Sequence, residues 1–416
     1  MTNANQTTAE QAHTAKCMRN ASLFLLSQAV SLFGSSIVQM AIIWKVTLDT
    51  SSGVWAMLLT VSATLPQTIL SFFAGVWADR FPRKRLIILA DAGIAAVTLA
   101  LYFLLQYGNA ANLLPLMVLI SALRSVGTGI QSPAVSAVIP QLVPEKHLMR
   151  YNGINGSVTS VIQFAAPAAA AALLSAGPFN RLLMLDVVTA AAGILLLAFV
   201  NIAPAKRDNT APKNTFFADL KAGISYAAGE KPVRRLLITY GAFIFLAVPS
   251  GFLVALMITR TFGDNYAYLT AAEMLGSLGM VLGGLLISSW GGFKNRYRTL
   301  TLGLVCYGAF SVALGMSYVF WIFAAFLLLE SFFIPVVLTA ATTMLQENVP
   351  EEKQGRVFGL FGAIYSGFLP LGMSVFGPLA DIVQIQPMVL VCGVLLLISG
   401  AVNFSVVIPA PTSQCR

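Results

Sequence analysis

About twelve stretches of roughly 20 mostly apolar residues follow one another along the chain, and short segments that hold nearly all of its charge separate them. A helix that crosses the hydrocarbon core of a bilayer needs about that many apolar residues. The sequence therefore predicts an all-α polytopic membrane protein with twelve transmembrane helices. The approximate spans are 21–44, 53–78, 86–106, 112–139, 155–176, 182–203, 235–259, 267–290, 298–316, 319–346, 356–380 and 387–408.

The composition agrees with a bilayer as the main solvent. Of the 416 residues, 57% are hydrophobic and 10% are charged, whereas soluble domains are roughly 45 to 50% apolar and about 25% charged. The net charge of +9 does not require nucleic acid as a partner, because most Lys and Arg residues fall on one side of the predicted membrane. By the positive-inside rule that side is the cytoplasm. We therefore expect a multi-pass protein of the cell inner membrane with both termini in the cytoplasm.

Several kinds of chemistry have no support in the sequence. The four cysteines lie far apart without a C-x-x-C pair, so neither a disulfide nor a metal site is predicted. No Gly-Lys pair occurs, which excludes the phosphate-binding loop of an ATP-driven pump, and the two histidines form no H-E-x-x-H motif. We therefore expect no enzyme and no cofactor, and the energy for any transport would come from an ion gradient.

A polar interval near the middle divides the chain into two halves. We predict an N-terminal bundle at 1–203, a cytoplasmic linker at 204–234 and a C-terminal bundle at 235–416. Within the linker, apolar residues from Phe216 to Ala227 recur at helical spacing, which predicts a short amphipathic helix on the cytoplasmic face. A helix that only joins the two halves is the alternative.

The two halves carry traces of an internal repeat. The segment V-P-E-K-H-L-M-R-Y-N-G follows the fourth span, and V-P-E-E-K-Q-G-R-V-F-G follows the tenth. Aligning them superposes Val143 on Val349 and Arg150 on Arg356. A parallel duplication of six helices predicts a match at this place, so we expect two pseudo-symmetric six-helix bundles.

The loop between the second and third spans reads G-V-W-A-D-R-F-P-R-K-R, from Gly75 to Arg85. Its glycine, its Asp-Arg pair one helical turn later and its basic cluster resemble the signature loop of the major facilitator superfamily. The resemblance implies close helix contact at the glycine and a charged cytoplasmic latch between the halves, although Pro82 replaces the usual glycine. A loop that only orients the chain in the membrane is the alternative. The latch residues implied are Gly75, Asp79, Arg80, Arg83 and Lys84.

The fourth span contains L-R-S-V-G-T-G, from Leu123 to Gly129, which is similar to the buried-arginine motif of the superfamily. An arginine at membrane depth must face protein or water, because exposure to lipid costs at least about 2.5 kcal/mol. The internal repeat places Glu330 at the position equivalent to Arg124. In the superfamily the fourth and tenth helices line a central cavity. We therefore predict that the side chains of Arg124 and Glu330 face this cavity and interact across it. Structural pairing of the arginine alone is the alternative.

Other polar residues within the spans are further candidates. The first span carries a polar stripe that consists of Gln28, Ser31, Ser35 and Gln39. The stripe fits a cavity lining, and hydrogen bonding to neighbouring helices is the alternative. Glu273 is a second candidate for protonation after Glu330, whereas Asp91 and Asp186 lie near predicted helix ends and are expected to be exposed or paired in loops. The predicted substrate-binding and proton-binding residues are Gln28, Gln39, Arg124, Glu273 and Glu330.

The fifth span contains A-A-P-A-A-A-A, from Ala165 to Ala171, which resembles the antiporter motif of the superfamily with alanines in place of glycines. Over nearly all twelve spans the chain looks most like the macrolide-efflux branch of the drug exporters. The resemblance implies a monomeric, proton-coupled exporter of amphiphilic drugs that works by alternating access. Its partners would be a small amphiphile, protons and membrane lipid. The alternatives are a proton-linked symporter or exporter of a metabolite or siderophore, and a non-transporting membrane receptor.

Overall fold

The computed structural model describes residues 2–107, 113–143, 145–202 and 224–405. Within these ranges it describes all side chains except those of 2–17, 71–80, 145–150, 351–352, 355–356 and 404–405. Every regular element in the described residues is a helix, and 12 helical segments there are long and apolar enough to cross a membrane. The predicted all-α fold with twelve transmembrane helices is confirmed.

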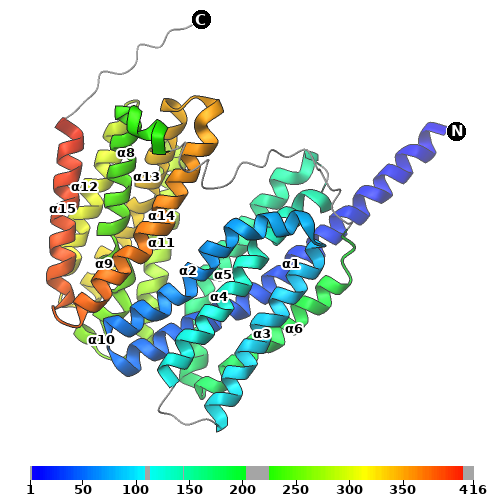
Figure 1. Ribbon diagram of the computed structural model, residues 1–416, viewed down its shortest axis with the longest axis horizontal. Coiled ribbons are helices and arrows are strands. Elements are labelled where there is room, and N and C mark those ends of the chain that lie inside the picture. Colours follow the sequence, from blue (N-terminus) through cyan, green and yellow to red (C-terminus); the bar gives the residue numbers. More distant parts are fainter. Residues whose placement is uncertain (1, 108–112, 144, 203–223, 406–416) are drawn as a thin grey trace, which may run out of the picture. The chain divides into compact units, whose positions relative to one another are not determined.

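Six long helices form the first half of the chain (Figure 1). Among them, α3 begins directly after Pro82 and α6 directly after Pro178. Proline suits a helix start because the first amides of a helix have no intrahelical acceptor. Both helices begin about one turn before the predicted spans. The six helices are α1 (Thr2–Thr50), α2 (Gly53–Arg80), α3 (Arg83–Tyr107), α4 (Leu113–Leu142), α5 (Glu145–Ala176) and α6 (Phe179–Ala198).

The second half differs from the prediction in its first span. The span predicted at 235–259 is present, since Lys231–Phe262 is long and apolar enough to cross a membrane, but its helix breaks at Ala247 and again at Leu253. Pro249 lies in the short helix between the breaks, where it cannot donate an amide hydrogen bond to the preceding turn. The helices are α8 (Lys231–Leu246), α9 (Val248–Phe252), α10 (Val254–Phe262), α11 (Tyr266–Trp290), α12 (Arg296–Gly315), α13 (Phe320–Asn348), α14 (Glu351–Ala380) and α15 (Ile385–Ser405).

The chain forms two compact units, and their division differs in one respect from the predicted bundles. The first unit comprises Met1–Val46 and Leu58–Ala211, and the second comprises Thr47–Met57 and Pro212–Arg416. The turn between α1 and α2 therefore belongs to the second unit, which the sequence does not predict. The predicted linker falls mostly on 203–223; of the predicted amphipathic helix, the part before residue 224 lies outside the described residues, and residues 224–229 are helical.

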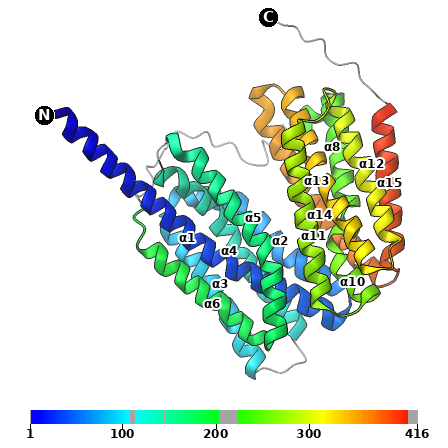
Figure 2. The ribbon, with the colours of Figure 1, turned by 180° about the vertical axis from the view of Figure 1, so that it is seen from behind.

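In the first unit, α3 packs along both α4 and α6 (Figure 2). An apolar core joins α1, α3, α4, α5 and α6 through fully or nearly fully buried side chains. Its members include Phe24, Ile87, Val138, Tyr151 and Leu197. This packing brings polar residues on α1, α3, α4 and α6 within reach of one another.

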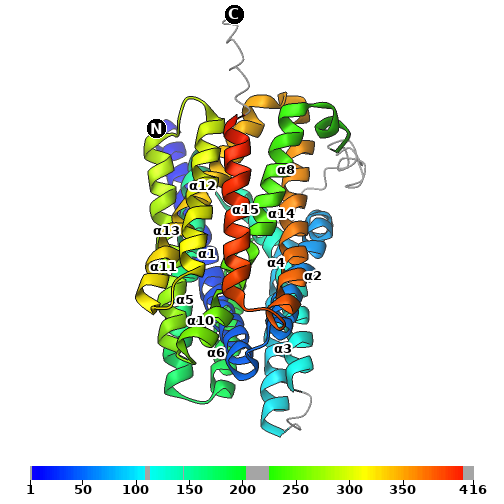
Figure 3. The same cartoon turned by 90° about the vertical axis from the view of Figure 1, so that its left-hand side faces the viewer.

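In the second unit, α12 packs along α13 and α15, and α15 also lies beside α8 (Figure 3). Its core combines aromatic and aliphatic side chains of α8, α12, α13, α14 and α15. Tyr240 of α8 stacks on Phe361 of α14 with ring centroids 3.8 Å apart, and Phe243 of α8 meets the edge of Tyr307 of α12. Aromatic pairs of these kinds add to the packing of apolar area.

Candidate functional site

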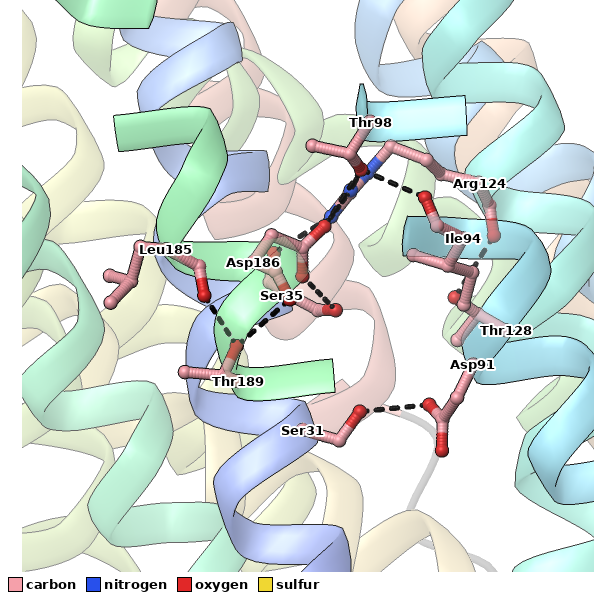
Figure 4. Close-up of polar contacts among 10 residues, drawn as sticks. All are labelled: Ser31, Ser35, Asp91, Ile94, Thr98, Arg124, Thr128, Leu185, Asp186 and Thr189. Atoms are coloured by element: carbon pink, nitrogen blue, oxygen red, sulfur yellow. Dashed lines mark hydrogen bonds and ion pairs between the residues drawn. The ribbon is translucent and has the colours of Figure 1, made fainter. Parts of the chain in front are cut away.

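Among the described residues of the first unit, three charged side chains are buried, and they come from three helices (Figure 4). Asp91 of α3 is 2% exposed, Arg124 of α4 is 4% exposed and Asp186 of α6 is 0% exposed. Charged side chains are almost never fully buried unless they are paired, and within membrane helices they mark functional sites. Their partners therefore decide what this cluster can do.

Arg124 and Asp186 form a buried ion pair (Figure 4). Nη1 of Arg124 donates to Oδ2 of Asp186 and to the hydroxyl oxygen of Thr98, whose Oγ1 lies 2.8 Å from the same carboxylate oxygen. Ser35 of α1 donates to Oδ1 of Asp186 at 2.7 Å, so both carboxylate oxygens are satisfied. A pair with this many hydrogen bonds recovers much of the cost of removing the two charges from water.

Asp91 has polar partners, and no ion pair joins it to a cation among the side chains that the structure describes. Its Oδ1 accepts hydrogen bonds from Ser31 of α1 and from the amide of Gln131 of α4, both at 2.8 Å. Its Oδ2 is buried and has no hydrogen-bond partner among the described residues. The amide of Gln131 also lies 3.5 Å from the Gln28 carbonyl oxygen, which connects the acid to the buried polar end of the stripe on α1.

Close contact between α1 and α6 places the serines of α1 against the two acids. A β-carbon on Gly34 would overlap the hydroxyl of Thr189, and one on Gly193 would lie 3.0 Å from the carbonyl oxygen of Ser27. Only glycine permits this approach of the two helices. Ser31 and Ser35 lie one helical turn apart, so a single face of α1 binds both carboxylates.

In the described part of the second unit, one acid is buried, in a different environment. Glu330 of α13 is 2% exposed and is surrounded by the hydroxyls of Ser250, Tyr307 and Ser311. Ser250 lies in α9, between the two breaks of the first span of this unit, and its Oγ shares a hydrogen bond of 3.0 Å with the Tyr307 hydroxyl. Oε1 of Glu330 is buried and has no hydrogen-bond partner in the described part of the chain.

Two expectations from the sequence need correction. Asp91 and Asp186 were expected to be exposed or paired in loops, but both are buried inside the first unit because α3 and α6 begin earlier than predicted. Arg124 was expected to interact with Glu330, but its partner is Asp186 of its own unit. The sequence signal for Asp91 was its apolar surroundings, since Ile87, Ala90 and Ile94 on both sides of it are buried.

The remaining predicted binding residues differ in their surroundings. Gln28 is 8% exposed and bonds to Ser27, whereas Gln39 is partly buried and its amide nitrogen has no partner among the described side chains. Glu273 of α11 is partly buried. For Ser31 and Ser35, the other members of the stripe, hydrogen bonding to neighbouring helices is what the structure shows.

Only part of the predicted latch can be described. The side chains of Gly75, Asp79 and Arg80 lie outside the described residues. Arg83 donates to the carbonyl oxygen of Ala137 in α4 at 2.6 Å. Lys84 donates to the carbonyl oxygens of residues 198 and 200 at the end of α6, at 2.8 and 2.7 Å, so both bases bind backbone within the first unit.

A further polar cluster, centred on Asp381 just outside the membrane spans, holds the turn between α1 and α2 in the second unit. The carboxylate of Asp381, which follows α14, accepts from the hydroxyl of Ser52 at 2.7 Å and from Arg260 at 2.9 Å. It also accepts from the first amides of α2, Gly53 at 2.6 Å and Val54 at 3.0 Å. Partial burial by itself would raise the pKa of Asp381, but these donors outweigh it and hold that pKa below its ordinary value of 3.8.

Comparison with known proteins supports one family. The sequence profile of the transmembrane secretion effectors, within the major facilitator superfamily, matches residues 18–415. Macrolide efflux protein A of Streptococcus pyogenes is 29% identical over 372 residues, which cover 89% of this chain and 91% of the relative. Macrolide efflux protein A of Enterococcus faecalis is 28% identical over 322 residues, which cover 76% of this chain and 99% of the relative.

Among solved structures, a bacterial homologue of the human lysosomal transporter Spinster has a similar fold. Its inward-facing, unoccupied structure matches with a TM-score of 0.68 at 16% sequence identity. The match covers 94% of this chain and 96% of that one. At this identity the likeness supports the fold and carries no information on the substrate.

Proposed function

Because the chain belongs to the transmembrane secretion effector family of the major facilitator superfamily, and is thus a multi-pass membrane transporter, we propose that it exports macrolide-like amphiphiles driven by protons. The observation that carries this proposal is the similarity to macrolide efflux protein A over nearly the whole chain, including both units. A similarity confined to one unit would support only a shared membrane fold.

The mechanism we propose is alternating access, in which the two units change their relative orientation around a substrate site. Their separate cores support motion as two bodies, because each unit keeps its own buried contacts. Proton binding would switch between the states. Buried acids without a cationic partner are suited to this role, because a proton removes the cost of a desolvated charge.

An apolar groove in the second unit supports an amphiphilic substrate. It lies between α8 and α14 and has a volume of about 580 Å³, within the range of roughly 300 to 1,000 Å³ typical of small-molecule sites. Its floor includes Gly241, and its walls include Phe245, Ile364 and Phe368. Such a surface can accept the apolar part of many molecules, since apolar contacts place few demands on ligand shape.

The cellular setting follows from the same proposal. The protein would lie in the cytoplasmic membrane as a monomer with both termini inside, and the proton gradient would supply its energy without a cofactor. The positions of the basic residues support this orientation. An inward-open state would take the amphiphile from the cytoplasm or the inner leaflet.

The test is accumulation of radiolabelled erythromycin, a macrolide, in bacterial cells that lack their own pumps. Cells that contain the protein should accumulate less label than cells that do not, and a proton ionophore should abolish the difference. No difference would remove the macrolide assignment, and higher accumulation would indicate import. The same accumulation assay is then run on Glu330→Gln and on Glu347→Gln. The first variant neutralises a buried acid and the second an exposed one, since Glu347 is 49% exposed.

A further inference from the structure

The buried charges of the first unit do not balance. Among the side chains of this unit that the structure describes, the fully buried charged ones are one cation, Arg124, and two acids, Asp91 and Asp186. Arg124 directs its Nη1 to Asp186 and its Nη2 to the backbone carbonyl oxygen of Ser35, and no hydrogen bond joins it to Asp91 among the described contacts. If both acids are ionised, the interior therefore carries one negative charge in excess.

An excess charge in this interior is costly. A buried carboxylate without a cation retains a penalty of several kcal/mol that hydrogen bonds offset only in part. The groups that face Asp91 are neutral on α1 and α4, where Ser31 and Gln131 donate to it. The charged group of the cluster on α6 is Asp186, an acid that already pairs with Arg124. A proton is the smallest ligand that removes this imbalance.

We propose that Asp91 is a proton-binding site of the export cycle, an inference that rests on the proton-driven export proposed above. Oδ2 is the atom that takes the proton, because Oδ1 is occupied by two donors and Oδ2 has no partner in the described residues. Asp186 is unsuited to this role because Arg124 and Ser35 already satisfy its two oxygens. Gln131, whose amide donates to Asp91, is only partly buried. A proton can therefore reach Asp91 from the side on which Gln131 lies.

Helix α1 connects this site to the rest of the unit. Ser31 donates to Asp91, and Ser35, one turn further along the same helix, donates to Asp186. A hydrogen bond to a charged acceptor is roughly twice as strong as one to a neutral acceptor. Protonation of Asp91 therefore weakens one of the two bonds between serines of α1 and carboxylates, and leaves the other unchanged. The charge state of the acid is thereby transmitted to the position of α1.

The experiment uses the purified full-length protein in liposomes with radiolabelled erythromycin. Two rates are measured: accumulation driven by an imposed pH gradient, and exchange of labelled for unlabelled erythromycin at equal pH on both sides. In Asp91→Asn we expect the rate of gradient-driven accumulation to fall at least about tenfold, which corresponds to about 1.4 kcal/mol in activation free energy. Exchange should continue at a reduced rate that no longer changes with pH. Asp91→Glu should restore part of the gradient-driven accumulation.

A substrate-free measurement keeps this inference separate from the macrolide assignment. Titrated from alkaline to acidic buffer, the wild type should take up one proton per chain more than Asp91→Asn. If the wild type moves no erythromycin but shows this difference, the macrolide assignment fails and the proton site stands. If the difference is absent, or if Asp91→Asn loses exchange as completely as accumulation and Asp91→Glu rescues neither, Asp91 has a structural role and the inference is overturned.

Discussion

The two units bury charge in different ways. In the first, Arg124 lies between helices and is joined to Asp186, Thr98 and the backbone of α1, so that removal of the arginine leaves Asp186 buried without a cation. In the second, Glu330 is the only fully buried charged side chain among the described residues, and hydroxyl groups surround it. A paired charge fixes helices in place, whereas a lone acid among neutral donors can gain or lose a proton without breaking an ion pair.

The largest effect should come from removal of Arg124. We expect Arg124→Leu to destabilise the protein by about 3 to 5 kcal/mol, because Asp186 is left buried without its cation. The double variant Arg124→Leu with Asp186→Leu should recover much of this loss, since it removes both charges at once. Thermal unfolding of the purified variants in detergent measures both effects. Equal destabilisation of the single and double variants would show that the pair does not carry the energy of this cluster.

A second comparison concerns helix contacts in the two units. Alanine at Gly34 would overlap the Thr189 side chain, whereas alanine at Gly283 would overlap the backbone carbonyl oxygen of Phe332. Overpacking of this kind destabilises proteins by about 1 to 3 kcal/mol. We expect Thr189→Ala to rescue part of the loss in Gly34→Ala, because the obstructing hydroxyl is removed.

No corresponding rescue is available at Gly283, because a side-chain change such as Phe332→Ala leaves the backbone oxygen in place. Melting temperatures of the single and double variants test the contrast. The contrary result is that Phe332→Ala raises the melting temperature of Gly283→Ala by as much as Thr189→Ala raises that of Gly34→Ala. In that case the helix contacts of the two units do not differ in the way inferred.

A smaller effect, of opposite sign, is expected at Glu330. Glu330→Gln keeps the shape of the side chain and removes a desolvated charge that no cation balances. We expect its stability to be unchanged or higher by about 1 kcal/mol, whereas Asp186→Asn, matched in chemistry, should lose stability because it breaks the pair with Arg124. Chemical unfolding of the two variants in parallel provides the measurement. A large loss in Glu330→Gln would mean that the second unit also holds its acid in a specific ionised network.

The sequence was most informative where one physical requirement dominates. The twelve helices could be predicted because crossing a bilayer demands a long apolar stretch, and neither neighbours nor turns alter that demand. The burial of Arg124 followed from the same reasoning. Its partner did not, because an ion pair depends on helix rotation and on a one-turn difference in where α6 begins, and neither is encoded in hydrophobicity.

The break in the first span of the second unit shows a related limit. Several prolines, such as Pro167 and Pro335, remain inside continuous helices, whereas Pro249 accompanies two breaks. Whether a proline ends a helix in a membrane depends on which neighbouring groups satisfy the freed carbonyls. The grouping of the turn between α1 and α2 with the second unit was equally hidden, since it depends on Asp381 in a distant part of the chain.

That turn allows the comparison to be extended from buried charge to charge near water. Asp381 caps the first amides of α2 and bonds to Arg260, yet it is 28% exposed. We expect Asp381→Ala to cost about 1 kcal/mol of stability, as for loss of a helix N-cap, and Asp381→Asn to cost less because an amide oxygen still accepts from the backbone. Thermal unfolding at neutral pH should rank the three proteins in this order.

The pH dependence of that difference has a definite sign. Because the pKa of Asp381 is lower in the folded state than its ordinary value of 3.8, its stabilisation is present above that value and is lost as the pH falls through the folded pKa. The wild type should therefore exceed Asp381→Asn in melting temperature at neutral pH, and the two should converge in acid. A difference that stays constant down to that pH would show that the hydrogen-bond geometry, and not the carboxylate charge, holds the turn. The exposed acid would then resemble Glu330 more than Asp186, since its charge would be dispensable for the contacts around it.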